Sequence, residues 1–525
     1  MKEACLVVSD RSVYMVNETI HFRVYNTSRL HVKNTGLSKV VYVELVSPDG
    51  QSLSRGKYAF NEQGAAGSIQ LPAHLLSGNY YLRAYTRWMR NWSPLPASYR
   101  LITVINPFVE EQLGSSGAGS DSARLQSIET KPLLRISTLP ATVKTNSSFV
   151  FDMENERDEE IDVSVSLVKS GSANGRRMFY PDAMMKPDTL RFIPETRGVS
   201  ISGKVISKDD AQPLAYSKVW MTMMDGERTS AEVLSREDGA FYIDLGNKSG
   251  VADLFLDVSS RDYLQTAGLL IDNDFEHRPL NLPFVPLDLS ADTLAWYNDL
   301  IMRAQLQSIY YSDTAAVNAT EAVQDSSFFY GTPAYVKSFD DFIELPRIID
   351  YIEELLPNVR VRNTSKGPEL SVYSNYTEMQ SYEALVMIDG VKVSDVGSLL
   401  KVNPRKISRV EVLDLPYYRG NMLYGGVVHF ISKANDMGEM TFPDESIFLS
   451  YQLLGKEEQA PFSSAQQQAP ANCLYWNPSL VLEAGKPVTL TLNSGIEPGS
   501  YDLKIEGPDQ DGSPFVILRT IVVQR

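Results

Sequence analysis

The chain has 525 residues, of which 43% are hydrophobic and 10% aromatic, and its formal net charge is −16. This length exceeds what one hydrophobic core supports and predicts roughly three to five domains. The negative charge argues against nucleic acid and against an anionic membrane surface as direct partners. No stretch approaches the roughly 18 unbroken apolar residues of a transmembrane helix. Because polar Lys2 and Glu3 follow Met1, we expect no signal peptide at the start of this sequence, and export would require a leader that has been removed.

The first module spans residues 1–108 and alternates short apolar strands with turns. In TIHFRVYN, the residues Ile20, Phe22 and Val24 recur at every second position, as in a half-buried strand. About seven such strands predict a sandwich. The run LRAYTRWMRN, from Leu82 to Asn91, resembles the MG2-type macroglobulin domain of Bacteroidetes envelope proteins. The resemblance covers nearly the whole module and implies the same β-sandwich fold.

Residues 109–127 contain GSSGAGSDS, which cannot bury apolar surface and predicts a linker. Residues 128–198 alternate again through LLRISTLPATV and IDVSVSLVKS. We interpret them as a second, degenerate macroglobulin-like β-sandwich. It is so short that sequence further along the chain could lend its last strands.

Residues 199–262 form the third module. Their pattern resembles the carboxypeptidase-regulatory-like domain, a small β-sandwich without peptidase activity, and it rests on Gly203, Val205, Pro213, Leu214, Val219, Asp238, Gly239 and Phe241. Residues 263–337 read as a connector with a helix around 291–308.

Residues 338–440 form an α+β module. A helix is predicted where Ile348, Ile349 and Ile352 recur at helical spacing. The run from Ala384 to Lys433 then gives a strand, a turn, a short helix, a strand, a Gly-rich corner and a strand. It resembles the plug domain of TonB-dependent outer-membrane receptors. Fewer than about a hundred residues follow Lys433, and a barrel strand takes roughly 10 residues, so we expect a plug without its barrel. Leu415-Pro416-Tyr417-Tyr418 stands where the receptors have Gly-Pro, which puts channel gating in doubt.

Residues 441–525 predict a C-terminal β-sandwich, opened by the strand LYWNP at Leu474–Pro478, which recurs in the same Bacteroidetes proteins. The fold class expected for the whole chain is therefore mainly β. It is a string of β-sandwich (macroglobulin/Ig-like) domains with one small α+β plug-like domain.

The sequence contains no motif of an enzyme. Macroglobulins trap proteases through a Cys-Gly-Glu-Gln thioester, but Leu6 follows Cys5 and Leu474 follows Cys473. These two cysteines read as buried thiols, and whether they pair is open. None of the five histidines pairs at metal-ligand spacing, and there is no Gly-x-Ser-x-Gly elbow. His429 reads as a surface or strand-face residue. We expect a protein without catalytic residues and without a cofactor.

Two acidic segments are weak candidates for calcium, which prefers oxygen ligands. The first holds Asp152, Glu154, Glu156, Asp158, Glu159 and Glu160. The second is the turn from Asp509 to Gly512. A solvated charged loop and an ordinary turn are the competing interpretations.

Two groups of aromatic and arginine residues are candidate partner-binding sites, because such side chains anchor interfaces. Trp88 and Trp92 lie beside Arg87, Arg90 and Asn91, and the second group comprises Tyr417, Tyr418, Arg419 and Tyr424. Packing at the end of a sandwich or at a domain corner is the alternative for both groups.

Plug without barrel, together with the absence of catalytic motifs, predicts a non-enzymatic scaffold in the periplasm or at the outer-membrane surface. It would bind a protein partner, such as an outer-membrane barrel protein in a transport or assembly complex. The alternative is a glycan- or peptide-binding accessory protein for nutrient uptake, with Trp88 and Trp92 stacking on the ligand.

Overall fold

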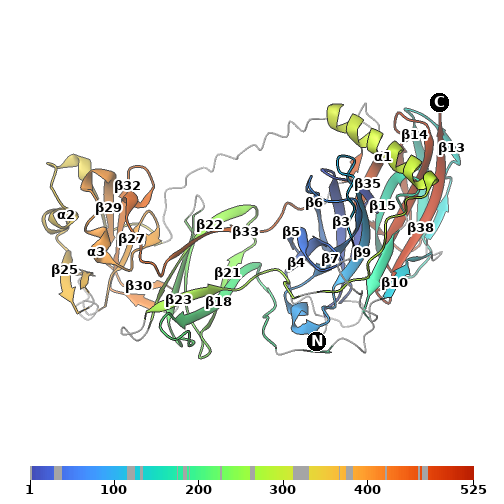
Figure 1. Cartoon of the computed structure of the whole chain (residues 1–525). Coiled ribbons are helices and arrows are strands. Elements are labelled where there is room, and N and C mark those ends of the chain that lie inside the picture. The colour runs from blue at the N-terminus through green and yellow to red at the C-terminus, as the bar shows by residue number, and fades with distance from the viewer. Residues whose placement is uncertain are drawn as a thin grey trace.

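The structure is a computed structural model. It describes the chain outside residues 1–2, 29–37, 115–123, 131–133, 174, 181–185, 188–189, 225–227, 261–265, 279, 311–329, 366, 374–381, 420–421, 459–460 and 464–470. The described part is mainly β, as predicted from the alternating apolar positions. Three β-sandwiches and one α+β domain follow one another in space (Figure 1).

The first sandwich packs a three-stranded sheet, in the order β1-β3-β6, against a larger sheet in the order β10-β16-β9-β7-β4-β5, with β2 also on β9. The strands of the small sheet are β1 (Cys5–Ser9), β3 (Thr19–Asn26) and β6 (Gly64–Gln70). Those of the large sheet are β2 (Val13–Met15), β4 (Val40–Val46), β5 (Ser52–Ala59), β7 (Gly78–Tyr85), β9 (Ser98–Ile105), β10 (Arg124–Ser127) and β16 (Arg176–Phe179). Ile20, Phe22 and Val24 of β3 lie in its core, as their alternation predicts.

The second sandwich is built from two distant parts of the chain. Its sheets run β12-β14-β36 and β11-β38-β37-β15-β35-β34, with β13 also on β38. The earlier strands are β11 (Glu129–Thr130), β12 (Leu134–Ser137), β13 (Thr142–Lys144), β14 (Ser148–Asn155) and β15 (Ile161–Lys169). The later ones are β34 (Phe462–Ser463), β35 (Cys473–Leu482), β36 (Pro487–Asn493), β37 (Gly499–Pro508) and β38 (Pro514–Gln524).

The prediction of two separate sandwiches at 128–198 and 441–525 is therefore wrong, although strands are indeed lent from further along the chain. β15 pairs with β35 on one side and with β37 on the other. Both sheets of this sandwich contain strands from both parts of the chain, so neither part by itself completes the two sheets that pack together. Strand β16 also leaves the predicted second module and joins β9 of the first sandwich.

The third sandwich consists of the sheets β21-β18-β23 and β20-β19-β22-β33. Its strands are β18 (Val199–Ser207), β19 (Lys218–Met223), β20 (Ser230–Leu234), β21 (Ala240–Gly246), β22 (Val251–Ser259), β23 (Ala267–Ile271) and β33 (Ile447–Gln452). The module is thus larger than the predicted 199–262. β23 comes from the predicted connector, and β33 comes from the predicted C-terminal module.

The fourth domain is α+β. Its sheet runs β24-β29-β32-β27-β28, and the hairpins β25–β26 and β30–β31 flank it. The strands are β24 (Tyr335–Ser338), β25 (Val359–Thr364), β26 (Gly367–Val372), β27 (Leu385–Ile388), β28 (Val391–Lys392), β29 (Ile407–Leu413), β30 (Tyr417–Arg419), β31 (Met422–Tyr424) and β32 (Val427–Ser432). The helices are α2 (Ile348–Leu355) and α3 (Val396–Leu399), with 3-10 turns at Phe339–Asp341, Pro404–Lys406 and Met437–Glu439.

Two further elements join domains. The helix α1 (Ala291–Tyr310), which includes the predicted helical range, packs Tyr297 and Leu300 against Val13, Met15 and Ile105 of the first sandwich. Its Trp296 Nε1 donates to the carbonyl of Ser170, beside the second sandwich. The 3-10 turn at Trp88–Asn91 is followed by β8 (Trp92–Ser93), which pairs with β17 (Lys186–Pro187).

Candidate functional site: the aromatic corners at the domain junctions

The first candidate corner lies at the end of β7, where Trp88–Asn91 forms a 3-10 turn. Arg87, Arg90 and Asn91 are buried, whereas Trp88 and Trp92 are each partly exposed. A buried guanidinium is costly unless its donors find acceptors. The partners of these residues therefore tell what the corner does.

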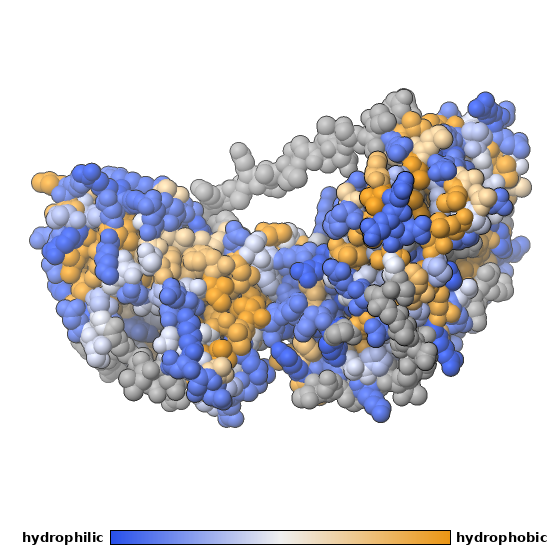
Figure 2. All heavy atoms as spheres, in the orientation of Figure 1, coloured by the Kyte–Doolittle hydropathy of each residue, from blue (hydrophilic) through white to orange (hydrophobic). Residues whose placement is uncertain are grey.

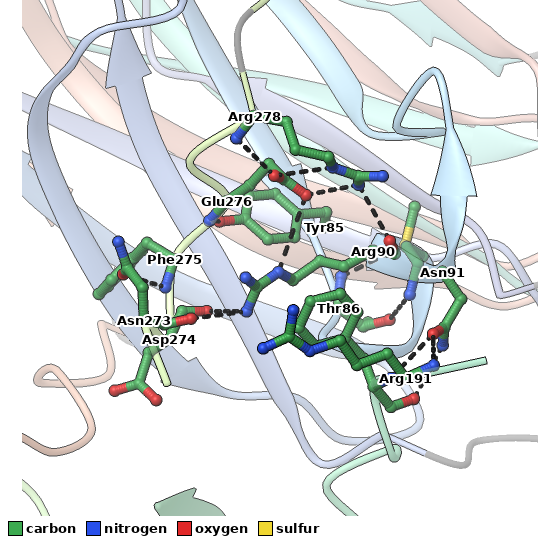
Figure 3. Close-up of polar contacts among 12 residues, drawn as sticks. Tyr85, Thr86, Arg90, Asn91, Arg191, Asn273, Asp274, Phe275, Glu276 and Arg278 are labelled. Carbon is green, nitrogen blue, oxygen red and sulfur yellow. Dashed lines mark hydrogen bonds and ion pairs between the residues drawn. The ribbon is translucent and has the colours of Figure 1, made fainter. Parts of the chain in front are cut away.

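Arg90 holds the segment 273–278 against the first sandwich (Figure 3). Its Nη1 donates to the carbonyls of Asn273 and Asp274, at 3.0 and 2.6 Å, and its Nε lies 3.8 Å from the Glu276 carboxylate. Arg278 donates to the same carboxylate at 2.6 and 2.9 Å. Burial raises the pKa of Glu276, but the hydrogen bonds from Arg278 outweigh burial and leave this pKa below its usual value. The carboxylate is therefore a fixed negative charge between two guanidinium groups.

Asn91 binds a second segment, at Arg191 and Phe192, to the same corner. Its Oδ1 accepts the backbone N–H groups of Arg191 and Phe192, both at 2.8 Å, and its Nδ2 donates to the carbonyls of Trp88 and Phe192. The guanidinium of Arg90 also lies over the Phe192 ring, 4.0 Å from its centroid. The segment LRAYTRWMRN thus contacts two other segments of the chain, around residues 191–192 and 273–278.

Arg87 reaches across to the third sandwich. It donates to Ser200 Oγ at 3.0 Å and to Ser202 Oγ of β18. Glu195 accepts from the Tyr42 hydroxyl at 2.9 Å and from the backbone and side chain of Ser200. Tyr42 and Tyr85 of the first sandwich belong to the same apolar core as strands β18 to β22. The corner therefore joins the first and third sandwiches.

Trp88 and Trp92 pack against each other, with ring centroids 5.6 Å apart and an interplanar angle of 71°. This edge-to-face arrangement is a common packing mode of aromatic pairs. Two cavities of the described residues are lined by other side chains. The corner is built as a structural cap, with two partly exposed rings on its surface.

The second candidate corner is the hairpin β30–β31, in which Tyr417 pairs with Tyr424 and Arg419 with Met422. Opposed residues of an antiparallel pair share one face, so these four side chains lie on one side and Tyr418 on the other. The inner face is covered by the third sandwich: Tyr424 is 1% exposed, and Tyr417 and Met422 pack with Trp220 in one cluster. Tyr418 is 72% exposed.

Polar contacts lock the inner face of this hairpin to strand β20. The Tyr424 hydroxyl donates to Glu232 Oε2 at 2.5 Å, and Arg419 donates to the carbonyl of Ser230. Lys392 Nζ lies 3.7 Å from the other Glu232 oxygen. Burial, then the nearby Glu232 charge, raises the pKa of Tyr424 far above its usual value. The hydroxyl is a permanent donor, so three of the four candidate residues hold two domains together.

His429 lies in strand β32, deep in the α+β domain, so the expected strand position is confirmed and the expected surface position is wrong. Gly390 N–H donates to its Nε2 at 2.7 Å, which leaves the proton on Nδ1, 2.7 Å from the Tyr330 oxygen. The Tyr330 hydroxyl in turn donates to Glu411 at 2.6 Å. Burial, then the Arg409 and Arg228 charges, lowers the pKa of His429 to about 3. The imidazole is a neutral structural group.

Tertiary structure brings parts of the two calcium candidates together. Glu159, Glu160 and Asp509 line a cavity of about 250 Å³ between the first and second sandwiches. Asp509 Oδ1 accepts from the backbone of Asp511 and Ser513, which makes it a turn residue. Among the described residues, no three acidic, histidine or cysteine side chains are placed to hold a metal ion.

The cysteines do not pair: Cys5 and Cys473 are both free thiols. Cys5 Sγ lies 3.3 Å from the Ala84 carbonyl, and Cys473 Sγ 3.4 Å from that of Tyr475. Within the described residues, no helix has both the length and the apolar character needed to cross a bilayer.

Comparison with known proteins finds no matching family model and no matching curated protein. Similar solved structures include Salmonella alpha-2-macroglobulin reacted with methylamine, with 8% identity and a TM-score of 0.24 over 100% of this chain and 40% of that chain. They also include the native conformation of Escherichia coli alpha-2-macroglobulin, with 8% identity and a TM-score of 0.24 over 99% of this chain and 40% of that chain. The chain spans about two fifths of the length of these structures.

Proposed function

We propose that this chain is a non-enzymatic scaffold of the bacterial envelope that binds a protein partner through its α+β domain. The observation that carries the proposal is the hairpin β30–β31. Its inner face is bound to the third sandwich, so Tyr418 is presented outward from an anchored element. An exposed tyrosine on a fixed backbone loses little entropy on binding and is a favoured interface anchor.

An open sheet edge lies at the same end of the domain. β24 is the outer strand of its sheet, and Tyr335 at its start pairs with Val412 near the end of β29. The hairpin follows directly after β29, with exposed Leu415 between them, and Val336 of β24 is also exposed. An extended peptide segment can add to such an edge through main-chain hydrogen bonds. The proposed contact surface comprises Val336, Leu415 and Tyr418.

Figure 2 shows one face of the molecule. Hydrophilic residues cover much of this face, and apolar groups gather over the third sandwich and near α1. The exported location rests on the resemblance of the sequence to Bacteroidetes envelope proteins. A transport or assembly complex of the outer membrane is the proposed setting. Uptake of glycans or peptides through Trp88 and Trp92 is the weaker proposal, because those rings pack on each other.

The test is site-specific photo-crosslinking in the native envelope, with a photoreactive amino acid at position 418. We expect a discrete crosslinked species that a Val336→Pro substitution at the β24 edge abolishes. The matched control is position 216, where Tyr216 is an exposed tyrosine of the third sandwich. Equal crosslinking at 216 and 418, or none at 418, would contradict the proposal.

A further inference from the structure

A cavity of about 370 Å³ lies where the first and second sandwiches meet. Its polar lining comes from Ser98, Gln126, Ser127, Arg177 and Ser513, and its apolar lining from Ala97, Ile128, Met178, Phe179 and Pro514, beside Cys5. This volume falls in the range of sites for small ligands. The elements around it are β9, β10 and β16 of the first sandwich and the start of β38 (Figure 1).

Arg177 is the charged residue in the described lining of this cavity, and the charged group behind it has an excess of positive charge. Arg177 of β16 pairs directly with Arg100 of β9, so the two guanidinium groups share one face of the sheet. Behind them, Arg100 and Lys504 share a single carboxylate, Glu506, at 2.5 and 3.2 Å. These three residues are fully buried. Three cations thus surround one anion, and Arg177 forms no ion pair with any described residue.

The hydrogen bonds of this group are also incomplete. Arg177 Nε and the Nε and Nη2 atoms of Arg100 are buried without a hydrogen-bond partner among the described residues. Arg177 Nη2 donates to Ser98 Oγ, which also accepts the N–H of Val7 at 2.9 Å. Both acceptor positions of this hydroxyl are therefore used, which leaves its O–H to donate, and Ser98 lines the cavity. Burial lowers the pKa of Arg177 to about 10, and the nearby Glu506 charge only partly offsets this shift.

Arg177 is partly buried. A partly buried cation without an ion pair is costly, and an anion that binds beside it reduces this cost. Guanidinium groups bind carboxylates in a planar, two-point arrangement. We propose that this cavity binds a carboxylate that carries a short apolar group, with the carboxylate on Arg177 and Ser98 and the apolar group against Met178, Phe179 and Pro514. Such a ligand is either a free short-chain acid or the C-terminal residue of a peptide.

The test is isothermal titration calorimetry of the full chain with isovalerate, with N-acetyl-leucine and with the neutral isovaleramide. We expect saturable binding of at least one acid, weakened at least about tenfold in Arg177→Gln, and no binding of the amide. Tighter binding of N-acetyl-leucine would identify a peptide C-terminus as the source, and tighter binding of isovalerate a free acid. The matched control is Arg176→Gln, because Arg176 is the exposed neighbour on the same strand.

Arg177→Gln removes a cation that has no ion pair. We therefore expect the melting temperature of the ligand-free variant to equal or exceed that of the parent protein. If that variant does not fold, Arg177→Lys keeps the charge, loses the planar fork and serves in its place. The proposal is overturned if neither acid binds, if the amide binds as well as the acid, or if the Arg177 variant binds like the Arg176 variant.

Discussion

Several charged residues in the interior of this protein are buried as ion pairs, both within a sheet and between domains. Arg83 and Glu44 form one such pair at 2.7 Å, with both side chains fully buried. Breaking a buried pair leaves one charge unpaired and costs more than the pair contributes to stability. The sequence analysis did not find these residues, because the sequence does not distinguish a buried arginine in a strand from a solvent-exposed one. One weak sequence pattern could have indicated them: an arginine at a strand position where the alternation of apolar and polar residues predicts a buried side chain.

His429 predicts a pH dependence of stability. The folded state holds the imidazole neutral, with a pKa of about 3, whereas the unfolded chain takes up a proton near pH 6.5. Between these values the unfolded state binds more protons, so stability falls as the pH falls from 6.5 toward 3 and is unaffected by this group above 6.5. The contribution has a slope of at most about 1.4 kcal/mol per pH unit.

The measurement is chemical unfolding of the parent protein and of His429→Gln across this pH window. We expect the difference in unfolding free energy between the two proteins to shrink as the pH is lowered. His74→Gln, at an exposed position, is the control for the loss of one histidine. Parallel profiles for the parent and His429→Gln would show that His429 is not the responsible group.

At the scale of elements, short segments act as clamps between domains. The sequence predicts a Gly-rich corner with aromatic residues at the hairpin β30–β31. It leaves undecided whether these residues bind a partner or pack at the corner of the domain. The alternation of its residues decides this: Tyr417, Arg419 and Tyr424 face the third sandwich, and Tyr418 faces outward. The same six-residue pairing therefore supplies a domain contact and a candidate binding surface.

Tyr424→Phe removes one buried charge-assisted hydrogen bond to Glu232 and should destabilise this clamp by about 1–3 kcal/mol. We expect faster backbone hydrogen exchange in β30, β31 and the facing strand β20, with no change in the second sandwich. Tyr418→Phe is the matched control, because its hydroxyl lies on the exposed face. Identical exchange in the two variants would mean that the hydroxyl of Tyr424 does not hold the domains together.

At the scale of the whole molecule, the chain folds as nested insertions. The α+β domain lies within the sequence of the third sandwich, which in turn lies within the sequence of the second (Figure 1). The returning segments also run along the first sandwich: Glu458 contacts His21 at 2.6 Å, and Lys57 contacts Asp274 at 2.8 Å. Relative motion of these domains would break several connections at once, which suits a rigid scaffold.

The nested insertions predict that two fragments of the protein, coexpressed as separate chains, assemble with each other. Residues 1–460 contain β11–β15, and residues 461–525 contain β34–β38, so each holds half of the second sandwich. We expect the fragments to copurify after coexpression, because β15 completes its pairing only between β35 and β37. Leu503→Lys in the second fragment, at a fully buried core position, should abolish copurification. Two fragments that fold independently without association would contradict the shared sandwich.

The sequence by itself determined the local elements of this protein. Alternation of apolar residues predicted the strands, the spacing of Ile348, Ile349 and Ile352 predicted α2, and the composition predicted a mainly β chain. These features depend on neighbouring residues, which a sequence displays directly. The chemistry of the candidate residues was also visible, as aromatic and arginine groups at two corners.

Only the tertiary structure decided which strands share a sheet and which side chains are exposed. β15 and β37 are more than three hundred residues apart in the chain, and either could have paired elsewhere on local grounds alone. Likewise, Arg177 became a candidate site only when its pairing with Arg100 placed two cations beside one cavity. Burial and electrostatic fields arise from contacts between distant segments, and the order of residues along the chain does not record those contacts.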